Sequence, residues 1–477
     1  MTTNNSSEKE KIKRPALWRI VCAVAACKAA RLLLRIGGRG GTALPGKVAM
    51  KFAANILAVT SAGMEIIAVT GTNGKTTTAR MLEQAFSHAG KACLSNKTGA
   101  NLLSGITAEF TANADFFGKP RVRYAVIECD EGALKQVMPL LRPKVLIVTN
   151  LFRDQLDRYG EVMHTLDAVR LGVKASPETI LCLNADCSLT ASLAMDVPNP
   201  VLYYGVNEPQ GDQGEVRLSD ATHCIRCGAS YEYTYHTYAH LGGFVCPSCG
   251  YRRMQPHTAA EKILHTDVTG TDITLKTIPP VSGEEMRRDI HVALPALYNV
   301  YNALAAVTAY TAAGHPAEEI LAALMDISSS FGRMETFDLQ GTPVQMILVK
   351  NPAGCNQAIE YVTGTERDYC AVILLNDRTA DGHDISWIWD AEYEKLCADP
   401  HARWILVSGE RAEDMCVRLK YGGAAKERVT LEKDLAKLIT RMKESGLPVM
   451  VLPNYTSMLA LRSALVKVTD KKEFWNM

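Results

Sequence analysis

Short apolar runs alternate with stretches of helical periodicity along most of the chain. β-branched runs that end in polar clusters predict strands, and the first four are Glu65–Thr70, Tyr124–Cys129, Val145–Asn150 and Thr179–Asn184. The stretch Thr76–Ala89, between the first two, has the spacing of a helix. We therefore expect an α/β fold with helices on both faces of a mostly parallel sheet. Ligands of such folds bind at the carboxyl ends of the strands.

The strand pattern starts again at about residue 340, after a link at Phe331–Glu335. The strands predicted there are Val344–Val349, Tyr369–Leu375, Trp404–Ser408 and Pro448–Pro453. Three parts are expected. Residues 1–44 hold a disordered start and a basic amphipathic helix, residues 45–335 form a central domain with an insertion at 206–258, and residues 336–477 form a C-terminal α/β domain.

The stretch 16–36 is apolar but is interrupted by four basic residues, Arg19, Lys28, Arg31 and Arg35. Its longest uncharged run is too short to cross a bilayer. The basic residues also interrupt any signal-peptide core. We expect an amphipathic helix that either contacts a membrane surface or packs on its own protein.

The most informative motif is VTGTNGKTTTAR at residues 69–80, directly after a β-branched run. Strand, glycine-rich loop and helix in this order form a phosphate-binding loop, whose backbone N–H groups and helix dipole attract an anion. Lys75 can reach the β- and γ-phosphates, and the Thr76 hydroxyl can hold Mg²⁺. Val69 stands where the strict Walker pattern has glycine. The predicted nucleotide-binding residues are Gly71, Thr72, Asn73, Gly74, Lys75, Thr76 and Thr77.

Composition narrows the class of protein further. Of the 477 residues, 47% are hydrophobic and 22% charged, with a formal net charge of +1. This balance fits a globular chain and gives no electrostatic reason to expect nucleic acid as a ligand. The 14 cysteines are mostly scattered among apolar positions, as in proteins of a reducing cytoplasm.

Four cysteines form two matched Cys-x-x-Cys pairs, Cys224 with Cys227 and Cys246 with Cys249. The spacing predicts a tetrahedral Cys₄ zinc ribbon, and a glycine follows each pair. Four thiolates leave no open coordination position, so a structural zinc is favoured over a catalytic one. A nucleic-acid finger and ordinary free thiols are the alternatives.

Five motifs together resemble the Mur ligase superfamily. They are GTNGKTTT, ECDE at 128–131, TNLFRDQLDRYG at 149–160, LPALYNVYNALAA at 294–306 and FGRME at 331–335. These enzymes join an amine to a carboxylate through an ATP-made acyl phosphate. Two positions depart from the family pattern, since Gln155 replaces a common histidine and Ala296 replaces the usual glycine of Leu-Pro-Gly. The segment before the loop is also too short for a UDP-sugar domain.

The resemblance implies roles for particular residues. Lys75 would hold phosphate, and Thr76 and Glu128 would hold Mg²⁺, with Asp130 and Glu131 as rivals of Glu128. Asn299 would contact adenine unless it only caps its helix. The other expected nucleotide-site residues are Arg333 from the domain link, Asn351 and Lys350 from the second domain, and, more weakly, Asn150 and Asp154.

The Cys₄ insertion and the segments LVKNPAGCNQAI and LLNDRTADGHDISWIWD resemble the MurT family within this superfamily. Members are synthetase subunits of lipid II isoglutaminyl synthases. The resemblance implies ATP-dependent amidation of the D-glutamate α-carboxyl of lipid II, at the inner membrane face, with ammonia from a GatD-like glutaminase partner.

One aspartate of this chain is expected to complete the partner's catalytic triad, with Asp384 as the first choice and Asp381 as the second. Trp387 and Trp389 beside them fit internal packing and an interface equally well. Cys355 lacks a nucleophile-elbow context, so we do not expect it to be a glutaminase nucleophile.

Two other functions remain open from the sequence. One is a Mur- or folylpolyglutamate-type ligase that acts alone on a free amino acid. The other is a nucleotide-switched binding protein with a zinc finger for nucleic acid, which the near-zero net charge disfavours.

Overall fold

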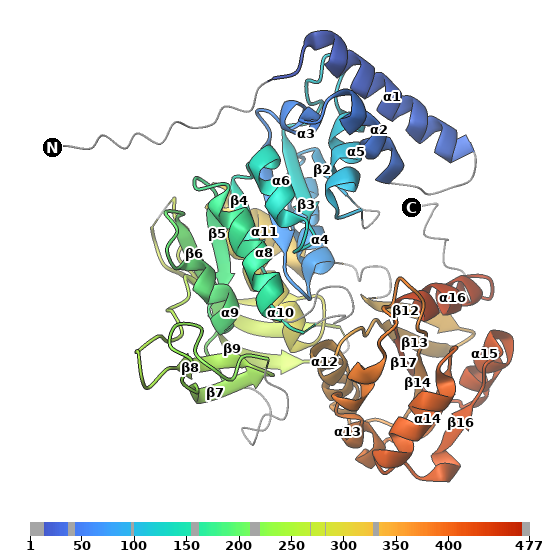
Figure 1. The fold of residues 1–477 in the computed structure, drawn as a ribbon. Helices are drawn as coiled ribbons and strands as arrows, with labels where there is room; N and C mark the ends of the chain where they lie inside the picture. Colours follow the sequence, from blue (N-terminus) through green and yellow to red (C-terminus); the bar gives the residue numbers. More distant parts are fainter. Residues whose placement is uncertain are drawn as a thin grey trace.

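Figure 1 shows the chain as two α/β lobes, with the N-terminal helices at the top of the first. The computed structural model describes residues 14–36, 43–96, 100–153, 162–209, 220–267, 269–281, 283–327 and 333–469. Predictions for residues 1–13, for Gln155 and for Asp154 lie outside this part of the chain.

Among the described residues, the first lobe contains a nine-stranded sheet in the order β11-β10-β9-β6-β5-β4-β1-β3-β2. The strands from β2 to β9 pair in parallel, whereas β9, β10 and β11 pair antiparallel. The strands are β1 (Glu65–Thr70), β2 (Cys93–Ser95), β3 (Tyr124–Glu128), β4 (Val145–Val148), β5 (Ile180–Asn184), β6 (Val201–Val206), β9 (Thr258–Thr266), β10 (Thr271–Thr277) and β11 (Met286–Val292).

Helices cover this sheet on both sides, as expected for strands that are buried along their length. The helix α10 packs across β4, β5 and β6 beside α4 and α11, and α6 packs with α8 on the other side (Figure 1). Their bounds are α4 (Lys75–His88), α6 (Leu134–Leu141), α8 (Val162–Lys174), α10 (Leu297–Ala312) and α11 (Ala317–Met325). Two short helices, α9 (Ser188–Ala191) and η1 (Ser192–Ala194), follow β5.

The N-terminal helices α1 (Leu17–Ile36), α2 (Ala43–Phe52) and α3 (Ile56–Thr60) pack together with α5 (Leu103–Asn113). Their own small core contains Ile20, Val24 and Cys27 of α1 and Ile56 of α3. The hydrophobic pattern of the sequence predicts α1 but not α2 and α3. Among the described residues, none of the helices combines the length and the apolarity that a membrane crossing needs.

The second lobe is built on a six-stranded sheet of the described residues, in the order β12-β13-β17-β14-β15-β16. Its strands are β12 (Arg333–Leu339), β13 (Thr342–Ile347), β14 (Tyr369–Leu374), β15 (Ala402–Ser408), β16 (Val429–Leu431) and β17 (Val449–Pro453). All neighbours except β12 and β13 pair in parallel.

Two apolar clusters lie on the two faces of this sheet. The helices α12 (Pro352–Thr363), α13 (Tyr393–Ala398) and α14 (Ala412–Tyr421) contribute to one cluster, and α15 (Leu435–Glu444) and α16 (Tyr455–Val466) to the other. The short helices η2 (Ser386–Trp389) and η3 (Lys426–Arg428) lie in connections. The predicted α/β class with mostly parallel strands is confirmed.

Candidate active site

The phosphate loop lies where the sequence pattern predicted it, between β1 and α4. Two of its glycines have a positive φ, 120° at Gly71 and 89° at Gly74. A Cβ atom at Gly74 would lie 2.1 Å from Oδ1 of Asn302 in α10. Only glycine therefore fits this position, because both the backbone conformation and the close neighbour exclude a side chain.

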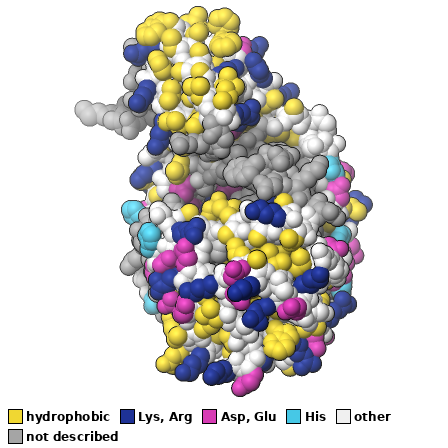
Figure 2. Space-filling model, turned by 90° about the vertical axis from the view of Figure 1, so that its right-hand side faces the viewer, with side chains coloured by type: hydrophobic (Ala, Val, Ile, Leu, Met, Phe, Trp, Pro, Cys, Tyr) yellow, Lys and Arg dark blue, Asp and Glu magenta, His cyan; other side chains and the backbone are white. Residues whose placement is uncertain are grey.

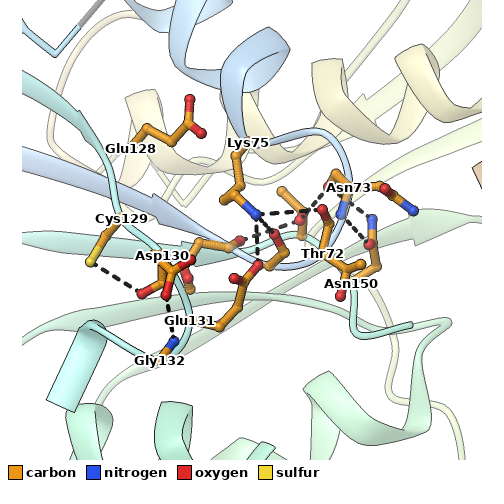
Figure 3. A network of polar contacts seen from close by, with 12 residues as sticks. Thr72, Asn73, Lys75, Glu128, Cys129, Asp130, Glu131, Gly132 and Asn150 are labelled. Atoms are coloured by element: carbon orange, nitrogen blue, oxygen red, sulfur yellow. Dashed lines mark hydrogen bonds and ion pairs between the residues drawn. The ribbon is translucent and has the colours of Figure 1, made fainter. Parts of the chain in front are cut away.

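Lys75 forms a short ion pair at the first turn of α4. Its Nζ lies 2.7 Å from Glu131 Oε1 and donates a hydrogen bond of 2.5 Å to the Gly71 carbonyl (Figure 3). Burial raises the pKa of Glu131, although the Lys75 charge acts in the opposite direction. A bound phosphate would compete with Glu131 for this ammonium group, because both are anions that approach the same Nζ.

The Thr76 hydroxyl donates a 2.6 Å hydrogen bond to Glu128 Oε2. The backbone of Glu128 is fixed by Asn96, whose amide accepts from the Glu128 N–H and donates to its carbonyl, at 2.9 and 2.7 Å. Mg²⁺ prefers one or two carboxylates together with hydroxyl, water and phosphate oxygens. The Thr76 and Glu128 oxygens fit such a site, and their role as ligands stays a prediction.

Residues that directly follow β4 hold the phosphate loop through hydrogen bonds. Asn150 Oδ1 accepts from the Asn73 N–H at 3.0 Å, and Thr149 Oγ1 donates to the Asn73 carbonyl at 2.6 Å (Figure 3). The Phe152 N–H donates to Thr72 Oγ1 at 3.0 Å. These contacts give the loop its shape through bonds to β4 and the segment that follows it.

The second lobe reaches the loop through one amide pair. Asn73 and Asn351 exchange side-chain hydrogen bonds of 3.1 and 3.4 Å. Asn351 also caps the start of α12, because its Oδ1 accepts from the Gly354 N–H at 2.8 Å. The structure thus brings Asn351 to the loop, and its contact with nucleotide stays a prediction.

Asn299 lies in the first turn of α10 and is 2% exposed. Its amide donates to the Pro295 carbonyl at 2.6 Å and accepts from Asn302 Nδ2 at 3.2 Å. The N-cap position of α10 is Ala296, and among the described residues no side chain caps this helix start, so the cap alternative for Asn299 is not supported. The adenine contact of Asn299 stays a prediction. Asn302, three residues along the same helix, was not predicted, although the helical spacing places it on the same face. Arg333 begins β12, and its side chain lies outside the described part.

Ala296 stands where related helices begin with glycine, and its backbone has φ 76° and ψ 144°. Residues with a Cβ are strained there, at a cost of about 1–3 kcal/mol. We expect Ala296→Gly to raise Tm by roughly 2–4 °C, because relief of this strain exceeds the greater entropy loss of glycine. Differential scanning calorimetry measures the shift.

Ala313→Gly is the matched control for this variant, because it lies at the other end of α10 with an ordinary φ of −72°. It is expected to lower Tm. Equal losses of Tm in the two variants would contradict the strain at Ala296.

The four predicted zinc ligands come together beside the hairpin of β7 (Glu232–Tyr238) and β8 (Leu241–Val245). Their sulfur atoms all lie within 4.8 Å of one another. Zn–S bonds of about 2.3 Å place the sulfurs of a tetrahedron about 3.8 Å apart, so the cluster fits zinc. Burial raises the pKa of Cys224, but hydrogen bonds from the N–H groups of Arg226 and Cys227 outweigh it and lower this pKa to about 6.

The hairpin beside the cysteine cluster also supports the phosphate loop. The ring of Phe152 packs against Tyr238 and His240, with ring centroids 5.8 and 4.7 Å apart. Phe152 in turn bonds to Thr72 of the loop. The hairpin that carries the cysteine cluster therefore reaches the phosphate loop through Phe152 and its two ring contacts.

Cys246→Ser is expected to abolish zinc binding and to lower Tm by about 5–10 °C, because a structural zinc site contributes folding free energy directly. ATP affinity is expected to fall roughly two- to tenfold through the lost packing on Phe152. Metal analysis, calorimetry and titration with ATP measure the three effects. Cys416→Ser, at a half-buried thiol of α14, serves as the control. A Cys246→Ser protein with unchanged zinc content would contradict the assignment.

The two candidate aspartates before η2 have different surroundings. Asp381 is 8% exposed, and both of its oxygens accept hydrogen bonds from Thr456, one of them 2.7 Å from the Thr456 N–H. Asp384 is half-buried and accepts from the Ser386 N–H at 2.8 Å. Hydrogen bonds from the Ser386 side chain and N–H lower the pKa of Asp384, so that it is ionised at neutral pH. The choice of Asp384 before Asp381 as the triad residue stays a prediction.

Cys355 is fully buried in the second lobe, and burial raises its pKa to about 12. A thiol with this pKa carries almost no thiolate at neutral pH. The expectation that Cys355 is not a nucleophile agrees with these surroundings.

Two family models match the chain. One, described as the Mur ligase middle domain, matches residues 69–242, and the other, described as MurT ligase C-terminal, matches residues 348–458. Together with the two mostly parallel sheets and the phosphate loop, these matches define a protein of the Mur ligase type.

The particular family follows from whole-length relatives. The chain is 32% identical over 431 residues to the lipid II isoglutaminyl synthase (glutamine-hydrolyzing) subunit MurT of Streptococcus pneumoniae, covering 90% of this chain and 93% of that protein. It is 30% identical to the same subunit of Staphylococcus aureus, covering 93% and 97%. The chain belongs to the MurT family.

Solved structures with the same fold have much lower sequence identity. MurF from Acinetobacter baumannii gives a TM-score of 0.64 at 15% identity, covering 90% of this chain and 81% of that chain. Folylpolyglutamate synthase from Mycobacterium tuberculosis gives 0.60 at 13% identity, covering 94% and 100%. These similarities support the fold only.

Proposed function

We propose that this chain is the synthetase subunit of a lipid II isoglutaminyl synthase, in which it amidates the D-glutamate α-carboxyl of the stem peptide. The observation that carries the proposal is the family relationship over nine-tenths of the chain, since it includes both the phosphate loop and the C-terminal lobe. ATP is the proposed energy source.

The proposed chemistry starts from the low reactivity of a carboxylate, from which ammonia would have to displace oxide. Transfer of the γ-phosphoryl group of ATP to the carboxylate gives an acyl phosphate and ADP. Ammonia then attacks the carbonyl carbon, the C–O bond to phosphate breaks, and the amide and inorganic phosphate form. Phosphoryl transfer depends on positioning and on neutralisation of charge.

Each loop residue has a place in this proposal. The N–H groups of residues 71–76 and the Lys75 ammonium would hold the β- and γ-phosphates, after phosphate replaces Glu131 at Lys75. Thr76 and Glu128 would hold Mg²⁺, which neutralises phosphate charge when bound. Asn351 would close over the nucleotide from the second lobe and exclude water, which would otherwise hydrolyse the acyl phosphate.

The ammonia source in the proposal is a GatD-like glutaminase that binds the second lobe. Asp384 lies in a shallow hollow of about 420 Å³ that is also lined by Trp389 and Arg411. Trp389 is 51% exposed beside it, as is typical of aromatic residues at protein interfaces. Asp384 would orient the imidazole of the partner's catalytic histidine.

The direct test combines the chain with its glutaminase partner, lipid II, ATP and glutamine, and follows the product by mass spectrometry. The expected product has a carboxamide in place of the D-glutamate α-carboxyl, and it requires both ATP and glutamine. Addition of a free amino acid to a precursor without the partner would instead favour a Mur- or folylpolyglutamate-type ligase and overturn the proposal.

A further inference from the structure

The outward face of α1 is apolar along its whole length. Five large side chains of this helix are between 56% and 76% exposed, namely Leu17, Trp18, Leu32, Leu33 and Ile36. The helical spacing places residues 17, 18, 21, 25, 29, 32 and 36 on one side of the helix. The opposite side is the buried one, which carries Ile20, Val24 and Cys27. The helix is therefore apolar on both sides, and only one of them is covered.

Other large hydrophobic side chains are exposed on neighbouring elements. Phe52 at the end of α2 is 42% exposed, and Phe116 and Phe117 after α5 are 52% and 61% exposed. Figure 2 shows hydrophobic side chains gathered over the top of the molecule, where Figure 1 places α1, with Lys and Arg side chains around them. Exposed apolar patches of this kind mark protein or membrane contacts.

The N-terminal part of this surface carries positive charge, and one carboxylate, Asp115, stands directly before Phe116 and Phe117. Residues 14–53 contain no Asp or Glu, and their basic residues are Arg14, Arg19, Lys28, Arg31, Arg35, Arg39, Lys47 and Lys51. Lys28 and Arg31 are bonded to the protein itself, at the Ala114 carbonyl and Glu109. Arg19 and Arg35 are exposed beside the apolar face.

We infer that the outward face of α1, with Phe116 and Phe117, is a docking surface for an anionic lipid bilayer, on which the helix lies parallel to the membrane plane. A helix of 20 residues, roughly 30 Å long, with Trp and Leu on one face and basic residues at its edges has the composition of an interfacial helix. The exposed Arg19 and Arg35 beside the apolar face add electrostatic attraction to anionic lipid headgroups. This inference relies on the proposed function in one respect only, which is that lipid II, the proposed substrate, lies in the membrane.

The test measures sedimentation of the full chain with vesicles of phosphatidylglycerol and phosphatidylcholine, without ATP, lipid II or partner. The wild type is expected to bind, and less strongly as salt rises. The triple variant Trp18→Asn, Leu33→Asn, Ile36→Asn is expected to bind roughly ten- to hundredfold more weakly. The double variant Arg19→Gln, Arg35→Gln is expected to lose the preference for phosphatidylglycerol.

The control is the triple variant Leu264→Gln, Val281→Asn, Met325→Gln, which also changes exposed apolar positions. It is expected to bind vesicles like the wild type.

A second measurement uses the fluorescence of Trp18. Lipids brominated in their acyl chains are expected to quench it in the wild type, and Trp18→Phe is expected to remove this quenching. Trp404→Phe, at a 45% exposed tryptophan of β15, is expected to retain it. Because no substrate is present, these results are separate from amidation, which is measured with detergent-dispersed lipid II.

Two results would overturn the docking surface. One is vesicle binding by the triple variant that equals that of the wild type and the control. The other is a triple variant that binds vesicles but no longer binds the glutaminase partner, which would assign the face to a subunit interface. Failure of amidation with intact vesicle binding would count against the proposed function alone.

Discussion

Lys75→Ala is expected to reduce ATP-dependent amidation about 100- to 1,000-fold, because the variant loses the positive charge that stabilises the transferring phosphate. The ammonium group lies at the first turn of α4 and is already paired with an anion, Glu131, at 2.7 Å. Steady-state release of phosphate with lipid II and glutamine measures the loss. Binding of the glutaminase partner, measured by size-exclusion chromatography, is expected to be unchanged.

Lys91→Ala provides the matched control, because Lys91 is also paired with a glutamate, Glu319, at 2.6 Å but lies just beyond the far end of α4. It is expected to retain most of the activity. If Lys75→Ala turned over substrate at the same rate as Lys91→Ala, the assignment of Lys75 to the active site would be contradicted.

Asp384→Asn is expected to suppress glutamine-dependent amidation by up to about 10⁴-fold, and to leave amidation with added ammonium within about twofold of the wild type. An amide in place of the carboxylate cannot stabilise the imidazolium of the partner's catalytic histidine. The ligase site of this chain is not altered, so ammonia supplied from solution bypasses the defect. Parallel assays with the two nitrogen sources measure the ratio.

Asp381→Asn separates the two candidate aspartates. Asp381 bonds to Thr456 at the start of α16, so its substitution is expected to lower Tm and to affect both nitrogen sources alike. A selective loss of glutamine use in Asp381→Asn, with normal glutamine use in Asp384→Asn, would reverse the assignment.

Local chemistry explains why parts of the fold and site could be predicted from the sequence. The strand β1 and the helix α4 follow from a β-branched run, two glycines and a helical spacing within residues 65–88. The cysteine cluster follows likewise from the Cys-x-x-Cys spacing. In both cases the residues that carry the signal are close together in the chain.

Contacts between distant segments could not be predicted in this way. Asn96 fixes Glu128 because β2 pairs with β3, and Asn302 lies against Gly74 because α10 packs beside α4.

Some helices and strands were also not predicted from the sequence, among them the helices α2 and α3 and the antiparallel strands β10 and β11. β11 is largely exposed, so its hydrophobic pattern is weak.

The N-terminal helix shows how burial changes an interpretation. From the sequence, α1 is a basic amphipathic helix with one apolar face. In the structure, two of its four basic residues bond to α5 and to the Ala114 carbonyl just after it, and the exposed side is apolar as well as the buried side. The sequence does not separate the two apolar sides, because either could be the one that faces the protein.

In the proposed reaction, ATP bound at the phosphate loop phosphorylates a carboxyl group, so that ammonia can displace phosphate. Lipid II carrying heavy oxygen in the D-glutamate α-carboxyl tests it directly, when it is incubated with the chain, its glutaminase partner, ATP and glutamine. One heavy oxygen atom is expected in each inorganic phosphate that is released, since the acyl phosphate breaks at its bond to carbon. Phosphate without the label, released while amide forms, would contradict the account.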